Sequence, residues 1–431
     1  IEAWVLDKVR RDTRDQIGKY HKVVITVPAY FDEVRRKATQ DAGYIAGFEV
    51  LDIINEPTAA AVFFGYQQGY LSADRVKDRP RRILVYDLGG GTFDVTLMEL
   101  RGHDFVALAT DGDVQLGGRD WDQRLVDCLA EEFIRKHGLD PREDPNVEGQ
   151  LLRECEDAKR TLSSRSRVNL SCQYRGKRVG KEVAREEFED MTLDLLERTS
   201  FTTRQTLKTA GFDWSDIDRI LLVGGSTRMP SVRRMLRDLS GIEPDRSVSP
   251  DEAVAHGAAL HAGLLLDKHE GRVPQFQIQN VNSHSLGVVA TDSQTKQVIN
   301  AILIPRNTRL PATEKKVFRT HKQGQRSVLV RIVEGEATDP DHCSRIGKCS
   351  IRDLPPGLAK NTPIEVGFRY LENGRLNVRV KVVGTGKLLQ HKIVRDNSLT
   401  EEQLNGWRRY ISGLPPLAQV VRHADKSPVQ S

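Results

Sequence analysis

The chain has 431 residues, of which 38% are hydrophobic and 29% charged, and its formal net charge is +5. This length exceeds one ordinary core and predicts two or three globular domains. The modest charge, without aromatic residues among the basic runs, argues against nucleic-acid binding. No apolar stretch approaches the length of a membrane span. The five cysteines lack zinc spacing, so we expect reduced thiols in a cytoplasmic protein.

The first part of the chain alternates apolar runs with stretches of helix-forming composition. Residues 23–27 and 50–54 predict strands, and residues 33–46 predict a helix. Residues 55–58 read as the start of a second helix. Further helices are expected from about residue 120 and over residues 151–162.

A glycine turn at residues 89–91 follows the apolar run 83–86. The residues after it, 93–98, alternate between apolar and polar, which predicts a second strand and therefore a hairpin. This argues against a dinucleotide fingerprint or a Walker loop, both of which need a helix directly after the glycines. Glycines let a backbone approach a phosphate, and Asp87 and Asp94 at the two ends of the bend suit a hydrated divalent cation.

A second glycine turn, Gly224-Gly225, follows the apolar run 220–223 and precedes helical spacing over residues 230–239. It therefore reads as a strand, a turn and a helix. Residues 249–252 offer a capping residue and a proline that would open a further helix over residues 253–266. Together the two glycine turns suggest a nucleotide held between two halves of a split domain.

From about residue 273 the chain is dominated by short β-like runs separated by turn residues, at 286–290, 317–319, 328–333, 364–370 and 376–383. Asn373-Gly374 is a hairpin signal. These runs predict a separate all-β module, most simply a sandwich. Residues 398–402 would cap one more short helix, and the tail from Pro415 is expected to be disordered.

Five motifs resemble, in the same order, motifs of the 70-kDa heat-shock chaperone family, the DnaK-type chaperones. They lie at residues 27–31, 54–61, 87–94, 154–163 and 222–230, and the β module resembles the family's peptide-binding sandwich at residues 285–287, 305–308, 334–336 and 363–366. The resemblance implies an α/β ATPase domain of the actin-like (ribonuclease H-like) fold, followed by an all-β substrate-binding sandwich. We expect the ATPase domain at residues 1–268, a linker at 269–283, the sandwich at 284–396, and a short helix with a tail at 397–431.

The resemblance also implies ATP or ADP with Mg²⁺ as cofactors, and it implies roles for individual residues. The catalytic residues that it implies are Glu56, Asp87, Thr92 and Asp94, of which Asp87 and Asp94 would hold the metal through water. The nucleotide is bound by Gly89, Gly90, Gly91, Thr92, Glu156, Lys159, Arg160, Ser163, Gly224, Gly225, Ser226, Arg228 and Asp251, with Arg228 free to stack on the base. An extended apolar peptide contacts Phe318, Val328 and Val330. Pro28 and Arg36 match family positions that relay the nucleotide state to the domain surface.

Several of these residues have an ordinary alternative that the sequence leaves open. The two aspartates of the first turn would by default be turn and strand-edge acids, and Glu56 would be a carboxylate in the first turn of a helix. Lys159 and Arg160 would usually form a solvated helix face. The three groove residues could equally be sandwich core.

The chain also departs from the family pattern. The family's first glycine hairpin and its phosphoryl-transfer lysine match nothing here. We therefore expect a fragment that lacks on the order of 100 N-terminal residues and hydrolyses ATP poorly by itself. The expected linker carries no acid at residues 275–281, Asp52 and Gln40 replace basic residues, and Asn300 replaces an apolar groove residue. No helical lid is expected after Trp407.

We therefore expect an ATP-dependent molecular chaperone of the heat-shock, or stress-response, type. Its nucleotide state would alter the affinity for unfolded apolar peptide segments during protein folding. A J-domain co-chaperone and a nucleotide-exchange factor are possible partners, whereas nucleic acid and membranes are not expected. The alternative is a non-cycling chaperone partner or scaffold that binds nucleotide without efficient hydrolysis.

Overall fold

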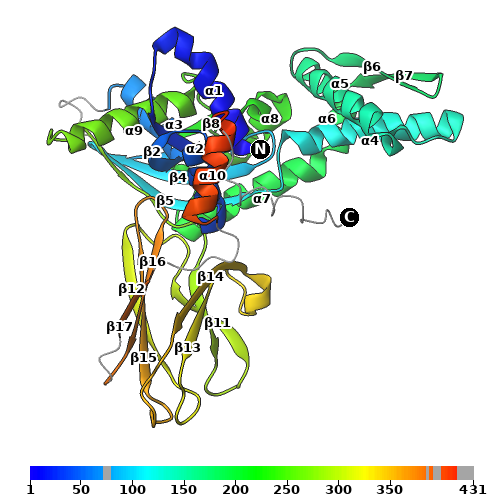
Figure 1. Cartoon of the computed structure of the whole chain (residues 1–431). Coiled ribbons are helices and arrows are strands. Elements are labelled where there is room, and N and C mark those ends of the chain that lie inside the picture. The colour runs from blue at the N-terminus through cyan, green and yellow to red at the C-terminus, as the bar shows by residue number, and fades with distance from the viewer. Residues whose placement is uncertain (71–78, 385–387, 392–398, 415–431) are drawn as a thin grey trace.

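The computed structural model describes residues 1–70, 79–384, 388–391 and 399–414, which form an α/β part followed by a β module (Figure 1). The α/β part contains α1 (Glu2–Ile17), β1 (Lys22–Val27), α2 (Glu33–Ile45), β2 (Glu49–Asn55), α3 (Glu56–Gln67), β3 (Arg81–Leu88), β4 (Phe93–Arg101), β5 (Asp104–Asp113), α4 (Gly118–His137), α5 (Pro145–Ser164), β6 (Arg167–Tyr174), β7 (Lys177–Ala184), α6 (Arg185–Met191), α7 (Leu193–Ala210), β8 (Arg219–Val223), α8 (Pro230–Ser240) and α9 (Ala253–His269). The remainder contains β9 (Gln277–Gln279), β10 (Leu286–Thr291), β11 (Val298–Ile304), β12 (Ala312–Arg319), β13 (Val328–Glu334), β14 (Ser344–Ile351), β15 (Pro363–Tyr370), β16 (Leu376–Val382), β17 (Leu388–His391) and α10 (Glu401–Ile411).

A five-stranded sheet in the order β8-β3-β4-β5-β9 forms the centre of the α/β part. Alternate side chains of β3 enter two different apolar clusters, with Leu84 and Tyr86 in one and Ile83 and Val85 in the other. The first cluster also contains residues of α4, α5, α7 and α8, and the second contains residues of α3 and α9. Helices therefore cover both faces of the sheet, which explains the nearly continuous apolar runs of its strands.

Both glycine turns have the predicted connections. The first joins β3 to β4 in an antiparallel hairpin, with Asp87 directly opposite Asp94. The second follows β8, and one turn of 3₁₀ helix at Gly225–Arg228 leads into α8. The helix predicted over residues 253–266 is confirmed as α9, which begins at Ala253, but its N-cap is Glu252 and not the expected capping residue. Ser249 closes a turn before α9 instead, its carbonyl oxygen accepting the amide of Ala253 at 3.0 Å.

The segment expected to be a linker is partly built into the central sheet. Gln277–Gln279 forms β9, which pairs in parallel with β5 at the edge of the sheet. The ring of Phe276 lies 5.8 Å from the ring of Phe105 in an edge-to-face arrangement, and it is buried. Asn280 accepts a hydrogen bond from Thr58 at 2.9 Å. This segment therefore contacts the α/β part through backbone and side-chain interactions.

The β module consists of two four-stranded antiparallel sheets, β11-β10-β13-β14 and β12-β15-β16-β17, which share one apolar cluster. The hairpin predicted at Asn373-Gly374 joins β15 to β16, and Gly374 has a φ of +73°. β11 and β14 were not predicted. Val328 and Val330 are buried in the shared cluster, and Phe318 packs against it while partly exposed. Asn300 is buried, its amide donating to the carbonyl oxygens of Gly335 and Ala337, so it braces a turn.

The last described helix packs against the beginning of the chain. Thr400 caps α10 as predicted, in a reciprocal capping box with Gln403. Leu404, Trp407 and Ile411 lie with residues of α1 and α2 in a small apolar cluster, and Figure 1 shows α10 beside these helices. The expected disordered tail lies outside the described residues.

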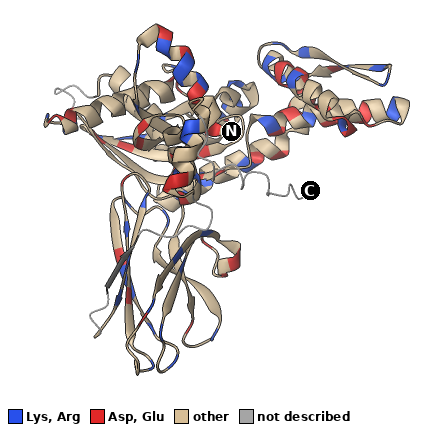
Figure 2. Ribbon diagram, in the orientation of Figure 1, with Lys and Arg blue, Asp and Glu red and all other residues tan. Residues whose placement is uncertain are grey.

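Basic and acidic residues are interspersed along the ribbons of α1, α4 and α5 (Figure 2). A search of the described helices finds none with the length and apolar character that crossing a membrane requires. All five cysteines are free thiols, as expected from their spacing.

Candidate functional site

The two glycine turns are in direct contact. Gly224 has a φ of +83°, and a Cβ atom there would lie 2.4 Å from the carbonyl oxygen of Leu88 and 2.8 Å from Oδ1 of Asp87. Only glycine permits this approach. Next to it, the hydroxyl of Ser226 donates to the carbonyl oxygen of Gly89 at 2.9 Å. The strand ends of β3 and β8 therefore hold the two turns against each other.

The N-terminus of α4 is a third element at the first glycine turn. The amide of Gly118 donates to the carbonyl oxygen of Gly89 at 2.9 Å, and the amide of Arg119 donates to that of Gly90 at 2.8 Å. A Cβ atom at Gly117 would lie 2.4 Å from the amide nitrogen of Gly91. This element was not among the predicted parts of the site. The glycine pair directly before a helix was the signal that could have identified it.

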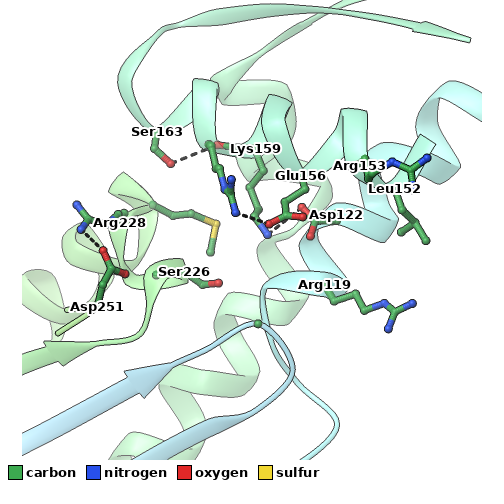
Figure 3. Close-up of a pocket in the computed structure, with 14 residues that line it drawn as sticks. Arg119, Asp122, Leu152, Arg153, Glu156, Lys159, Ser163, Ser226, Arg228 and Asp251 are labelled. Atoms are coloured by element: carbon green, nitrogen blue, oxygen red, sulfur yellow. Dashed lines mark hydrogen bonds and ion pairs between the residues drawn. The ribbon is translucent and has the colours of Figure 1, made fainter. Parts of the chain in front are cut away.

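A cavity of about 760 Å³ opens beside these turns (Figure 3). Nine of the predicted nucleotide residues line it: Gly90, Glu156, Lys159, Arg160, Ser163, Gly225, Ser226, Arg228 and Asp251. Five further lining residues were not predicted: Arg119, Asp122, Leu152, Arg153 and Met229. The other predicted residues, Glu56, Asp87, Gly89, Gly91, Thr92, Asp94 and Gly224, do not line it. They belong to the two turns and to a carboxylate group at the base of the first turn.

Lys159 is a buried residue of the cavity wall, so the alternative of a solvated helix face is wrong for it. Its ammonium group lies 2.8 Å from Oδ1 of Asp122 and donates to the carbonyl oxygen of Gly118 at 2.7 Å. Burial raises the pKa of Asp122, and the hydrogen bond from Lys159 opposes that rise. This pair connects α5 to the start of α4 and hence to the first glycine turn.

The two other basic residues predicted to bind nucleotide are also paired. Arg160 forms an ion pair with Glu156 at 2.5 Å on α5. Arg228 forms one with Asp251 at 2.5 Å. Because an ion pair lies in the plane of the guanidinium and leaves its faces open, stacking of Arg228 on a base stays a prediction. Both pairs have substantial exposure. Figure 3 shows Arg228 and Asp251 together at the end of the cavity opposite Arg119.

Three carboxylates gather at the base of the first glycine turn: Glu56, the first residue of α3, with Asp87 and Asp94. The side chains of Asp87 and Asp94 are almost inaccessible, with exposed fractions of 6% and 1%. Burial raises the pKa of Glu56 to about 7, and burial together with Glu56 raises that of Asp94 to about 7. The pKa of Asp87 is raised well above its ordinary value by burial, then by Glu56 and Asp94.

These carboxylates repel one another, and within the described ranges no ion pair neutralises them. Such a group favours a cation, because a nearby positive charge would offset both the repulsion and the cost of burial. Among the described residues, no three acidic, histidine or cysteine side chains are placed to ligate one metal ion directly. A cation bound here would therefore need water among its ligands.

A short loop connects this carboxylate group to the β module. Asp94 accepts the amides of Ala29 and Tyr30 at 3.1 and 3.0 Å. The ring of Tyr30 lies 4.2 Å from that of His284, whose Nε2 is 3.0 Å from the Tyr30 carbonyl oxygen. Arg36 donates to the carbonyl oxygen of Ala29 and to Asn55. The loop thus spans from the base of the glycine turn to the start of the β module.

Comparison with known proteins agrees with this architecture. The family model described as Hsp70 protein matches residues 1–414. The chaperone protein DnaK of Halobacterium salinarum is 40% identical over 412 residues, covering 94% of this chain and 63% of that protein. DnaK of Thermosipho africanus is 38% identical over 412 residues, covering 94% and 67%. The chain thus spans about two thirds of the length of these curated relatives, and it belongs to the Hsp70 family.

Proposed function

We propose that the chain binds ATP or ADP with Mg²⁺ and that the bound nucleotide governs how the β module holds unfolded, apolar peptide segments. The observation that carries the proposal is the contact between the two glycine turns, beside a cavity on one side and three mutually repelling carboxylates on the other. A phosphate chain needs the backbone amides of glycine turns, and its metal needs nearby carboxylates. The family relationship supports the same conclusion.

In this proposal, the nucleoside occupies the cavity between α5 and the second glycine turn. Glu156 and Lys159 would contact the ribose side, while Arg160, Ser163 and Arg228 would surround the base. Because Arg228 is bound to Asp251, we propose that it forms an edge of the base site. The phosphates would extend toward Gly89–Gly91, where the amides of a tight turn can donate to them.

The carboxylate group would hold a hydrated metal, and the repulsion among its members supports this assignment. Bound Mg²⁺ would neutralise charge on the terminal phosphates and on the carboxylates. Asp87 and Asp94 would hold its water ligands, the hydroxyl of Thr92 would contact a phosphate, and Glu56 would orient the attacking water. With a pKa raised to about 7, Glu56 could accept a proton from that water near neutral pH.

We also propose a β-sandwich peptide-binding domain in residues 284–396, an ATPase domain in residues 1–268, and a connecting segment between them. Phe318 is the predicted groove residue that keeps part of its side chain exposed, and we assign it to the peptide surface. The buried Val328 and Val330 would support that surface from below. A J-domain co-chaperone and a nucleotide-exchange factor are the partners proposed from the family.

Calorimetric titration of the chain with ATP, ADP and adenosine, with and without Mg²⁺, tests the nucleotide proposal. We expect ATP and ADP to bind, and Mg²⁺ to strengthen ATP binding more than adenosine binding. Failure of all three ligands to bind would contradict it. The affinity for a fluorescent apolar peptide, measured with and without ATP, tests the coupling. An affinity that ignores ATP would instead favour a non-cycling binder.

A further inference from the structure

The charges that line the cavity are not balanced. Three carboxylates each have a basic partner: Asp122 with Lys159, Glu156 with Arg160, and Asp251 with Arg228. Arg119 and Arg153 also line the cavity, and in the described part of the chain neither forms an ion pair with an acid. The lining therefore carries two positive charges in excess, which favours an anionic ligand.

Arg119 differs from Arg153 in how its backbone is held. It is the second residue of α4, and its amide donates to the carbonyl oxygen of Gly90 at 2.8 Å. The preceding residue, Gly118, is tied in the same way to Gly89 at 2.9 Å. Arg153 lies on α5 and has no such tie to the turn. The side chain of Arg119 therefore starts from a fixed point against the predicted phosphate turn.

The position of Arg119 in the cavity matches the phosphate end of a nucleotide. Figure 3 shows it across the cavity from Arg228 and Asp251, which we assigned to the base. Gly90 lines the same cavity. A guanidinium group can donate two parallel hydrogen bonds to a phosphate, and the positive end of the 20-residue helix α4 adds to the attraction.

We propose that Arg119 is a phosphate-binding residue that recognises the terminal phosphate of the nucleotide and so favours triphosphate over nucleoside. This inference rests on the proposed nucleotide function and adds a residue that the glycine motifs did not include. Arg119 contacts the phosphate with its side chain from α4, while the first glycine turn contacts it with backbone amides. Its contribution is confined to ligands that carry phosphates.

Calorimetric titration of the chain with ATP, ADP, AMP and adenosine tests the proposal, using Arg119→Met and the control Arg178→Met, at an exposed arginine of β7 that does not line the cavity. For Arg119→Met we expect ATP to bind about tenfold or more weakly, the factor that corresponds to about 1.4 kcal/mol, with adenosine unchanged. The loss of affinity should be smaller for AMP than for ATP, and it should be smaller at high salt than at low salt. Arg178→Met should leave the ratio of ATP to adenosine affinity within about twofold of the wild-type value.

The outcomes separate the two proposals. If the wild type binds ATP and Arg119→Met leaves the ratio of ATP to adenosine affinity unchanged, Arg119 is a solvent-facing arginine and its assignment is overturned. Equal losses for ATP and adenosine would also overturn it, because they would indicate a distorted cavity. If the wild type binds none of the four ligands, the proposed function fails, and the Arg119 assignment fails with it. Unchanged thermal unfolding of the variants shows that their fold is intact.

Discussion

The acids that line the cavity and the acids at the base of the first glycine turn lie close together in the fold, but their electrostatic environments are opposite. Around the cavity, each carboxylate has a basic partner, as Asp122 has in Lys159. At the turn, Glu56, Asp87 and Asp94 have no basic ion-pair partner among the described residues. Burial raises the pKa values of all three, and neighbouring carboxylates raise those of Asp87 and Asp94 further. A satisfied ion pair maintains the shape of a wall. Uncompensated buried charge is a cost that a ligand can relieve, and it marks where a cation should bind.

Breaking the buried ion pair between Lys159 and Asp122 in the cavity wall should give the largest loss of stability. Lys159→Met leaves Asp122 buried without its partner, and we expect the free energy of unfolding to fall by about 3 kcal/mol. Urea unfolding of the chain measures this. The double variant Lys159→Met with Asp122→Leu should recover part of the loss, because it removes the stranded charge as well. A loss below about 1 kcal/mol would show that this pair behaves like a surface pair.

Removing an acid from the carboxylate group should have the opposite effect on stability. Asp87→Asn relieves repulsion, so without Mg²⁺ the chain should become more stable. Since the pKa of Asp87 is raised in the folded state, the cost of its charge grows as the pH rises, and the gain should be larger at pH 8 than at pH 5. The same variant should weaken Mg²⁺ binding by roughly 10- to 100-fold. Asp104→Asn, an exposed acid on β5, is the control and should change neither quantity.

Features that depend on neighbouring residues could be predicted from the sequence, whereas contacts between residues far apart in the chain could not. The hairpin at Gly89–Gly91 was predictable because a two-residue period is local, and the residues of α5 were predictable because their motif is contiguous. The pairing of Arg228 with Asp251 was not, because 23 residues separate them and no local pattern records the contact. The site role of Arg119 was missed for the same reason. It depends on an amide that reaches a turn almost 30 residues earlier in the chain.

Two segments of the fold show how far local sequence signals could be used. The segment around Gln277 was expected to be a linker because it stands where the family has its interdomain linker, yet its backbone pairs with β5. The alternation of polar and apolar residues at 275–281 is typical of a strand and was the signal for this pairing. Likewise, the helix expected from residue 253 begins at Ala253, but Ser249 closes a turn before it and does not cap it.

Glu334 is a buried acid in a third kind of environment. In the described part of the chain it forms no ion pair with a basic residue, unlike Asp122, and acids do not surround it on all sides. It lies between the β module and α2, and it accepts the amide of Glu33 at 2.9 Å. Burial is the largest cause that raises its pKa from 4.5 to about 8. Asp32 and Glu33 add to the rise, while the Glu33 amide and Arg36 oppose it, and Tyr370 also faces it.

Because the pKa of Glu334 is higher when the β module contacts α2 than when it is free, this contact should be strongest below pH 4.5 and weaken as the pH rises through about 8. Small-angle scattering of the chain from pH 5.5 to 8.5 should show an increasing radius of gyration. Glu334→Gln should remove this dependence, whereas Glu365→Gln, on the other sheet, should retain it. A wild-type radius that does not change with pH would rule out this linkage.

The exposed pairs of the cavity should give the smallest effect. Arg228→Met breaks the ion pair with Asp251, but both side chains are more than half exposed. We expect the free energy of unfolding to change by less than about 1 kcal/mol. The contrast with Lys159→Met, measured by the same urea titration, tests whether burial determines what each pair contributes. Similar losses in the two variants would remove that distinction.

The most direct test of the central claim is the number of protons released when Mg²⁺ binds. Titration calorimetry at pH 7, in buffers with different heats of ionisation, measures that number. Since the pKa values of Glu56 and Asp94 lie at about 7, part of the carboxylate group is protonated there, and a cation must displace those protons. We predict release of about half a proton or more, an affinity that rises from pH 6 to 8, and loss of both effects in Asp87→Asn. Binding without proton release, at an affinity that is the same in Asp87→Asn, would contradict the claim.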